Sequence, residues 1–385
     1  MNRFDVIVIG AGPAGGTAAL ALARQGRSVA LIEKAAFPRY KVCGEFVSRA
    51  AWSVLAALGV ADPLRAVAGP AVRTVGLWQG EEILQTSVGD QALGRAIGRH
   101  VLDATLAAAA RNAGATRLHP AKACSLAREG DTWHVGVDTD SGSTTLEAPI
   151  VIAAHGAWET GPLPTQRAEP PRRPLLGFKA RFLDARLRDG YMPLVIFPGG
   201  YGGLVRTDGG AVSFSLCIRA DVLAHCRKEL HAHTAGEAAF LHVCRHVRGI
   251  REALGEATLE RAWMGAGPIR PGFRGLARDG LFRVGNAAGE AHPLVAEGIG
   301  MAIESGALLA ASLARWDGSI APLDAIERDY RRRWRRAIAS RIVASMALER
   351  VTTVAPGLVT HAARTLPGLF ALAARWSGKG RLAPV

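Results

Sequence analysis

A short apolar strand that runs straight into a glycine-rich turn is the feature that most constrains the fold of this chain. Residues 4–9, FDVIVI, are first alternating and then continuously apolar, and residues 10–15 carry glycines in the spacing G-x-G-x-x-G. The Ala- and Leu-rich segment 16–25 predicts a helix directly after the turn, and a second apolar run, 28–32, ends at Glu33. This order of strand, glycine turn, helix, strand and acid is typical of the βαβ unit that binds a dinucleotide.

The three glycines of the turn have different roles in such a unit. Gly10 allows the tight turn, Gly12 lets a pyrophosphate approach the backbone, and Gly15 allows the helix to pack closely on the strand. The free N–H groups at the start of the helix then face the phosphates with a partial positive charge. Glu33 lies where its carboxylate accepts both hydroxyls of an adenosine ribose. Because a carboxylate there disfavours a 2′-phosphate, the pattern predicts FAD or NAD rather than NADP.

The composition is that of a globular protein with room for two domains. The chain has 385 residues, and 49% of them are hydrophobic. No apolar run without charges reaches the length of about eighteen residues that a membrane-spanning helix needs. The first strand begins so early that we expect no signal peptide. Five cysteines without a CxxC spacing suit a reducing compartment, so we expect a cytoplasmic protein.

The net charge of +14 does not by itself indicate nucleic-acid binding. The basic residues are spread along the chain, and no DNA- or RNA-binding signature accompanies them, so we expect no nucleic-acid partner. Attraction of an anionic cofactor, an acidic carrier protein or anionic lipid is a more specific use of this charge. The basic stretch 330–336 precedes an apolar helical segment. It predicts a peripheral contact at the inner face of a membrane or a cover over a long apolar substrate tunnel, with packing on the nucleotide-binding domain as the alternative.

Three further segments carry informative patterns. They are LFRVGNAAG at 281–289, with Pro293 and EGIGMA at 297–302 behind it; FPRYKVCGEFVS at 37–48; and RHVLDATL at 99–106. With these motifs the chain resembles the superfamily of FAD-dependent oxidoreductases that contains aromatic hydroxylases (class A flavin monooxygenases), flavin halogenases and geranylgeranyl reductases. It is most similar to the geranylgeranyl-reductase-like branch.

The resemblance implies an α/β fold with a discontinuous Rossmann-like FAD-binding domain, an inserted α+β substrate domain and C-terminal helices. The implied boundaries are 1–70, 94–160 and 275–320 for the FAD-binding domain, 71–93 and 165–274 for the substrate domain, and 321–385 for the C-terminal helical region. A linker with five prolines, 161–174, lies near the start of the second part of the substrate domain.

Motifs of the superfamily assign a set of residues to non-covalent FAD binding. The candidates are Gly10, Gly12, Pro13, Ala14, Gly15, Glu33, Lys34, Arg39, Cys43, Gly44, Arg99, Ala123, Gly285, Asn286, Pro293, Gly298 and Ile299. The superfamily pattern reads G-D-A-A-G…P…G-E-G-I, so Asn286 replaces the aspartate that binds the ribityl chain, and Ala296 replaces a glycine. Asn286 can still hydrogen-bond a ribityl hydroxyl. No second dinucleotide fingerprint exists, so we expect either that NAD(P)H binds only transiently as electron donor or that another reductase supplies the electrons.

Three side chains are candidates for catalysis, although a structural role is an alternative for each. His292, just before Pro293, can move protons if it lies near the flavin. Glu45 and Cys43 follow from the motif that runs beside the flavin in the reductase-like branch. Histidines and cysteines also cluster between 225 and 246, but their spacing fits no known zinc site, so we expect no metal.

The reaction is less constrained than the cofactor. The first hypothesis is monooxygenation of a lipophilic, aromatic or polyketide-like small molecule through a flavin hydroperoxide. The second is reduction of C=C bonds in an isoprenoid or other lipid, as in geranylgeranyl reductases. Dehydrogenation, halogenation and an inactive flavin-binding scaffold remain further alternatives. The substrate and the oligomeric state are left open.

Overall fold

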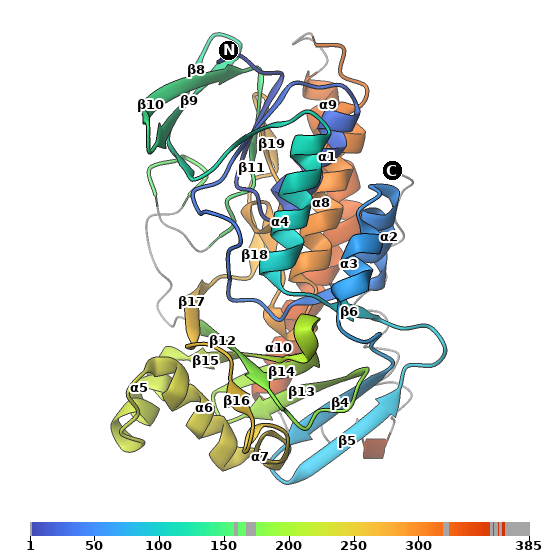
Figure 1. Ribbon diagram of the computed structural model, residues 1–385, viewed down its shortest axis with the longest axis vertical. Coiled ribbons are helices and arrows are strands. Elements are labelled where there is room, and N and C mark those ends of the chain that lie inside the picture. The colour runs from blue at the N-terminus through green and yellow to red at the C-terminus, as the bar shows by residue number, and fades with distance from the viewer. Residues whose placement is uncertain are drawn as a thin grey trace.

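The computed structural model describes residues 2–157, 161–166, 175–318 and 323–354, together with residues 357, 361, 364 and 365. Two sheets with their helices form the upper and lower parts of the molecule in Figure 1. The upper part contains the N-terminal glycine turn, and the lower part contains a larger, mostly antiparallel sheet. Segments from the N-terminal and the C-terminal regions of the chain lie together in the upper part.

A six-stranded sheet is the centre of the upper part, with strand order β19-β20-β11-β1-β2-β7. Its strands are β1 (Val6–Ile9), β2 (Val29–Ile32), β7 (Thr116–Leu118), β11 (Ile150–Ala153), β19 (Ala277–Arg278) and β20 (Leu281–Arg283). Strand β1 pairs in parallel with β2 and with β11, and all its residues are buried. Parallel strands that are covered on both faces have continuous apolar sequences, which explains the run that opens the chain.

Three helices cover one face of this sheet and lie side by side in Figure 1. They are α1 (Pro13–Arg24), α4 (Arg99–Asn112) and α8 (Gly298–Leu313). Glycines allow their close approach, because a Cβ at Gly306 would overlap the backbone oxygen of Ala14 in α1. The opposite face is covered by the antiparallel strands β8 (Ala121–Glu129), β9 (Thr132–Thr139) and β10 (Gly142–Ala148), whose apolar side chains pack against the sheet.

The lower part is an eight-stranded sheet in which β17 pairs with β12, beside the path β16-β12-β15-β14-β13-β4-β5. Its strands are β4 (Thr74–Gln79), β5 (Glu82–Ser87), β12 (Leu175–Leu183), β13 (Tyr191–Phe197), β14 (Gly200–Arg206), β15 (Val212–Arg219), β16 (Thr258–Leu259) and β17 (Met264–Ile269). Helices α5 (Ala220–Glu229), α6 (Ala235–His246) and α7 (Arg248–Leu254) cover one face, and their apolar side chains share a buried core with the sheet.

The C-terminal region begins with α9 (Leu323–Trp334), continues through one π-helical segment (Arg335–Ala339) and ends in α10 (Ser340–Val354). The remaining short elements are α2 (Arg49–Ala57), α3 (Ala61–Val67), β3 (Phe46–Ser48), β6 (Gly94–Ala96), β18 (Gly272–Phe273) and β21 (Gly289–Glu290). Within the described ranges, no helix has the length and apolarity needed to cross a membrane. Apart from four residues, the predicted helical region beyond Val354 lies outside the described residues.

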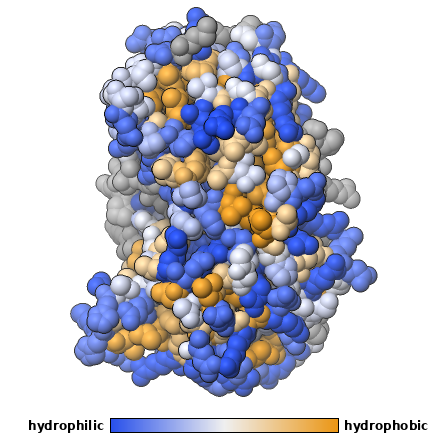
Figure 2. All heavy atoms as spheres, viewed as in Figure 1, coloured by the Kyte–Doolittle hydropathy of each residue, from blue (hydrophilic) through white to orange (hydrophobic). Residues whose placement is uncertain are grey.

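The predicted fold class is confirmed: a Rossmann-like α/β domain, a second sheet with helices and C-terminal helices are all present. The face in Figure 2 is mainly hydrophilic, with smaller apolar patches between the upper helices and the lower sheet. The exact domain boundaries stay a prediction, because sheet order defines layers and leaves the boundaries open.

Candidate functional site

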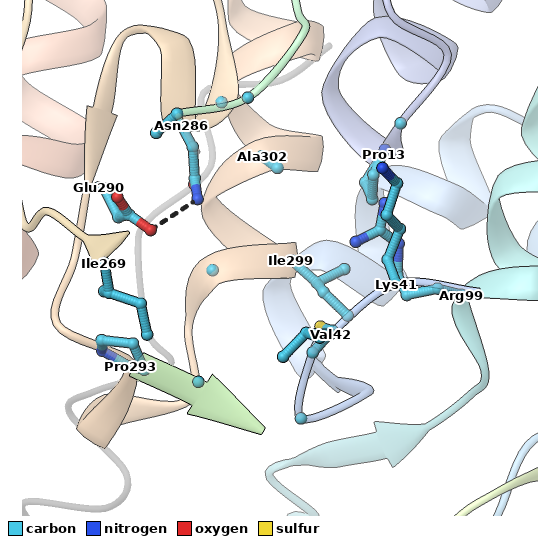
Figure 3. A pocket seen from close by; sticks show the side chains of 18 of the residues that line it. Pro13, Lys41, Val42, Arg99, Ile269, Asn286, Glu290, Pro293, Ile299 and Ala302 are labelled. Carbon is cyan, nitrogen blue, oxygen red and sulfur yellow. Dashed lines mark hydrogen bonds between the residues drawn. The ribbon is translucent and has the colours of Figure 1, made fainter. Parts of the chain in front are cut away.

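A cavity of about 810 Å³ extends from the glycine turn of β1 to the inner face of the lower sheet. All of the predicted cofactor-binding residues line it except Gly15, which packs beneath the turn. Figure 3 shows Pro13, Lys41 and Arg99 on one side of the cavity, and Asn286 and Glu290 on the other. The motifs that are far apart in the sequence therefore surround a single elongated space.

The glycine turn is built so that only its middle glycine faces open space. Gly10 has a φ of +105°, and a Cβ there would lie 2.7 Å from the carbonyl oxygen of Ala154 in the neighbouring strand end. A Cβ at Gly15 would overlap the carbonyl oxygen of Gly10. At Gly12, by contrast, the nearest atoms to a Cβ would be arginine nitrogens at 3.5 and 3.6 Å. The turn thus leaves a cradle above Gly12, at the start of α1.

Two arginines point at this cradle and share one buried carboxylate. Asp103 is fully buried and lies 2.7 Å from Nη2 of Arg99 and 3.0 Å from Nη2 of Arg39. Burial alone would lower the pKa of Arg99, but the Asp103 carboxylate outweighs it and raises that pKa. Nε of Arg39 is buried without a hydrogen-bond partner in the described part of the chain. Two guanidinium groups beside a glycine cradle suit a pyrophosphate.

Glu33 is held in place by backbone amides at the end of β2. Its Oε2 accepts a hydrogen bond from the N–H of Ala11 at 3.0 Å, and its Oε1 accepts one from the N–H of Ala35 at 3.1 Å. Arg39 lies 3.3 Å from the same carboxylate. Glu33 is thereby an oriented acceptor at the edge of the cavity, as its position in the motif predicts.

Sequence reasoning missed Asp103, although it lies within the quoted motif at 99–106, four residues after Arg99. We expect Asp103→Asn to lower the free energy of unfolding of the apoprotein by about 1–3 kcal/mol, because two buried hydrogen-bonded cations lose their shared anion. Urea denaturation measures this. The matched control is Asp131→Asn, since Asp131 is 59% exposed and 3.4 Å from Arg128. A control that loses as much stability as Asp103→Asn would contradict the buried role.

Asn286 is positioned by two neighbours that the motif does not contain. Its Nδ2 donates to Oε1 of Glu290 at 3.1 Å, drawn in Figure 3, and its backbone oxygen accepts a hydrogen bond from Arg274 at 2.8 Å. Arg274 also lies 3.3 Å from the Glu290 carboxylate, which is nearly fully buried. An aspartate at position 286 would face this carboxylate directly. The asparagine is therefore the residue type that Glu290 favours here.

Two of the three catalytic candidates line the cavity, and the third lies behind its wall. Cys43 and Glu45 line the cavity, and Sγ of Cys43 accepts a hydrogen bond from the N–H of Glu45 at 3.5 Å. His292 is buried and does not line the cavity. Its ring lies behind Tyr201, which does line the cavity and which sequence reasoning did not select. The catalytic roles of all three candidates stay predictions.

Glu45 belongs to a buried ion pair that connects the upper and lower parts. It is completely buried, has a φ of +60° and bonds to Nζ of Lys179 on β12. Arg181, two residues further along β12, lies 3.8 Å from Glu45 and 3.1 Å from Asp208. The segment that carries Cys43 is thus fixed to the lower sheet by charge pairing as well as by packing.

Two of the histidines between 225 and 246, His242 and His246, bond to backbone carbonyl groups. Nε2 of His242 bonds to the carbonyl oxygen of Pro198 at 2.9 Å, and Nδ1 of His246 bonds to the carbonyl oxygen of His242 at 2.8 Å. Across the residues that the structure describes, no group of three or more His, Cys, Asp and Glu side chains could hold a metal ion.

Comparison with known families agrees with this geometry. The FAD binding domain family matches residues 3–163, and the FAD dependent oxidoreductase family matches residues 95–316, which is more than half of the chain. The chain belongs to the FAD-dependent oxidoreductases. It is an enzyme of the superfamily that includes monooxygenases, halogenases and geranylgeranyl reductases, and FAD is its cofactor.

Two curated relatives align with most of the chain. A digeranylgeranylglycerophospholipid reductase from Methanocaldococcus jannaschii is 26% identical over 360 residues, which cover 86% of this chain and 82% of the relative. A menaquinone reductase from Mycolicibacterium smegmatis is 27% identical over 330 residues, which cover 80% of this chain and 76% of the relative.

Solved structures support the fold at lower sequence identity. The myxobacterial chondrochloren halogenase superposes with a TM-score of 0.73 at 21% identity, covering 87% of this chain and 80% of the halogenase. A geranylgeranyl bacteriochlorophyll reductase-like protein from Thermoplasma acidophilum gives a TM-score of 0.68 at 20% identity, covering 95% of this chain and 97% of that protein. At these identities the likeness concerns the fold alone.

The residues of the cavity fit FAD. The cradle at Gly12 and the two guanidinium groups suit its pyrophosphate, and Glu33 suits its ribose. Asn286, with Pro293 and the start of α8, lines the far half of the same space. When bound, FAD supplies hydride transfer between an electron donor and the substrate.

Proposed function

We propose that this enzyme reduces carbon–carbon double bonds in the isoprenoid chain of a lipid, with NAD(P)H as the transient donor of reducing equivalents. The observation that carries the proposal is the long apolar extension of the cofactor cavity across the lower sheet. An isoprenoid chain is apolar along its whole length, so its recognition depends on such a surface rather than on charged anchors.

Apolar side chains from four strands of the lower sheet form this extension. They are Val75 on β4, Met192 and Leu194 on β13, Leu204 and Val205 on β14, and Leu216 on β15. Leu348 of α10 also lines the cavity and is 41% exposed, so the cavity reaches the protein surface beside this helix. Such an opening suits a substrate whose polar head stays outside while its chain reaches the cofactor.

The curated relatives support the same class of substrate. Both are named as reductases, one of a digeranylgeranyl lipid and one of menaquinone, and both align with most of this chain. The two named substrates share an isoprenoid chain. This favours the second of the two hypotheses drawn from the sequence, while monooxygenation of an aromatic molecule stays the competing proposal.

The side chains of this protein have three tasks in the proposed reaction. Arg39 and Arg99 hold the phosphates of the cofactor, and Asn286 orients its ribityl chain. The apolar walls exclude water, so that the hydride is not lost to solvent. A group on the substrate side must supply the proton that completes each reduction.

Turnover without oxygen is the experiment that tests the proposal. We expect enzyme reduced by dithionite under nitrogen to regain its oxidised flavin absorption when digeranylgeranyl glycerophospholipid in detergent micelles is added. Mass spectrometry should show a lipid heavier by one H2 per turnover. The saturated diphytanyl lipid is the matched control and should leave the flavin reduced. Flavin that reoxidises only when oxygen is admitted, with a product heavier by one oxygen atom, would contradict the proposal and support monooxygenation.

A further inference from the structure

A tyrosine of the lower sheet and a histidine of the loop between β21 and α8 meet at the wall of the cavity. Tyr201 lies on β14, lines the cavity and is 8% exposed. Its hydroxyl group lies 2.9 Å from Nδ1 of His292, and the two rings are 5.2 Å apart. The pair joins residues that are 91 positions apart in the sequence.

The backbone N–H of His292 is already hydrogen-bonded to α10. Only the imidazole ring is therefore left to donate or accept a proton. Its backbone N–H donates to Oγ of Ser345 on α10 at 2.8 Å, and that hydroxyl donates to the carbonyl oxygen of Ile342 at 2.7 Å. Burial lowers the pKa of His292 to about 4, and the nearby Glu349 carboxylate opposes this shift only in part. At neutral pH the ring is therefore neutral, with one nitrogen that donates and one that accepts.

Glu349 is a charged group that acts on both members of this pair. It lies on α10, one turn after Ser345, is only partly buried, and is the charged group that acts on His292. The other titratable groups that act on Tyr201 are Cys217, opposite it on β15, and Glu290. The Tyr201–His292 hydrogen bond thus begins at the apolar cavity and ends beside α10, the helix that carries Ser345 and Glu349.

We propose that Tyr201 is the catalytic proton donor of the reduction and that His292 is the positioning residue that resupplies its proton. The inference rests on the proposed function. One carbon of the double bond gains the hydride of the reduced cofactor, and the other gains the hydroxyl proton of Tyr201. The tyrosinate takes the Nδ1 proton of His292, and the His292 ring then regains one proton at Nε2 from solvent. The double bond gains two electrons and two hydrogens, and NAD(P)H is the reductant consumed.

Three other protic groups on the wall are less suited to this task. The Glu45 carboxylate is paired with Lys179. Burial raises the pKa of both the Cys217 thiol and the Tyr201 hydroxyl, so the hydrogen bond of Tyr201 to His292, rather than acidity, separates the two groups. Thr352 donates its hydroxyl to the carbonyl oxygen of Leu348, one turn earlier on α10. Tyr201 combines access to the cavity with a link to a titratable side chain.

Tyr201→Phe tests the inference, with Tyr191→Phe as the matched control. Tyr191 is a buried tyrosine of the same sheet whose hydroxyl accepts a hydrogen bond from Nε1 of Trp78 at 2.8 Å, outside the cavity. We expect Tyr201→Phe to bind FAD and to be reduced by dithionite as the wild type is. Its anaerobic reoxidation by the digeranylgeranyl lipid should be slower by about 100-fold or more. Tyr191→Phe should reoxidise at the wild-type rate.

Two further measurements separate a relay from a structural role. Tyr201→Phe/His292→Gln should be no slower than Tyr201→Phe alone, since both changes interrupt one path. In apoprotein with 15N-labelled histidine, the Nδ1 signal of His292 should be that of a protonated nitrogen that donates a hydrogen bond, and Tyr201→Phe should remove that hydrogen bond. Equal reoxidation rates for the two tyrosine variants, or an unchanged Nδ1 signal, would overturn the relay while the reductase assignment stands. A wild type that needs oxygen would overturn both.

Discussion

Gly12→Val is expected to give a folded protein that retains no FAD. A side chain at Gly12 meets only arginine nitrogens at 3.5 Å or more, so the apoprotein can accommodate it. The same side chain occupies the cradle in which the pyrophosphate has to lie. We expect overpacking to cost about 3 kcal/mol or more of binding free energy, which is roughly a 100-fold loss of affinity. The flavin absorption of the desalted protein and the thermal unfolding of the apoprotein measure the two effects.

The neighbouring glycine supplies the control. A Cβ at Gly15 would overlap the carbonyl oxygen of Gly10, so Gly15→Val should destabilise the apoprotein itself. The two variants therefore separate a cofactor contact from a packing requirement within one motif. A yellow Gly12→Val protein, or an apoprotein as unstable as Gly15→Val, would show that the cradle does not receive the cofactor.

Part of the cofactor site could be predicted from the sequence. The order of strand, glycine turn, helix and acid is a local pattern, and most of the residues that it selected, up to Glu33, line one half of the cavity, whereas Arg99 was selected through the superfamily motif at 99–106. Asp103 was within reach, because an acid four residues after Arg99 on a helix lies on the same face. The pairing of Asn286 with Glu290 is also local. The motif comparison, however, concerned only the replacement of the superfamily's aspartate by Asn286.

The substrate half of the site was harder to predict, because its residues come together only in three dimensions. The sequence of β12 places Lys179 and Arg181 on one face of the strand, since side chains alternate there. Nothing in the sequence shows that Glu45, 134 positions away, is their partner. His292 was selected for its place beside Pro293, whereas access to the cavity belongs to Tyr201. The distances between these partners are set by how the lower sheet packs against the segments that carry Glu45 and His292.

Lys179→Met is expected to be among the most destabilising single changes in this protein. Lys179 and Glu45 are both essentially unexposed, and the lysine is the group bonded to the Glu45 carboxylate. Its loss leaves a buried charge whose remaining cation, Arg181, is 3.8 Å away and already engaged by Asp208 and Glu260. Removing one partner of a buried pair costs about 3–5 kcal/mol. Urea denaturation of the holoenzyme, followed by circular dichroism and by flavin release, measures the loss.

Two variants give this prediction its controls. Lys228→Met removes an exposed lysine from α5 and should change the free energy of unfolding by less than about 0.5 kcal/mol. Lys179→Met/Glu45→Gln removes both charges and should recover a large part of the stability, because no uncompensated charge remains buried. Flavin release should then return toward the urea concentration of the wild type, since Glu45 lies beside Cys43 and Gly44 on the cavity wall. If Lys179→Met behaves as Lys228→Met does, charge pairing does not join the cofactor segment to the lower sheet, and apolar packing alone holds the two halves of the cavity together.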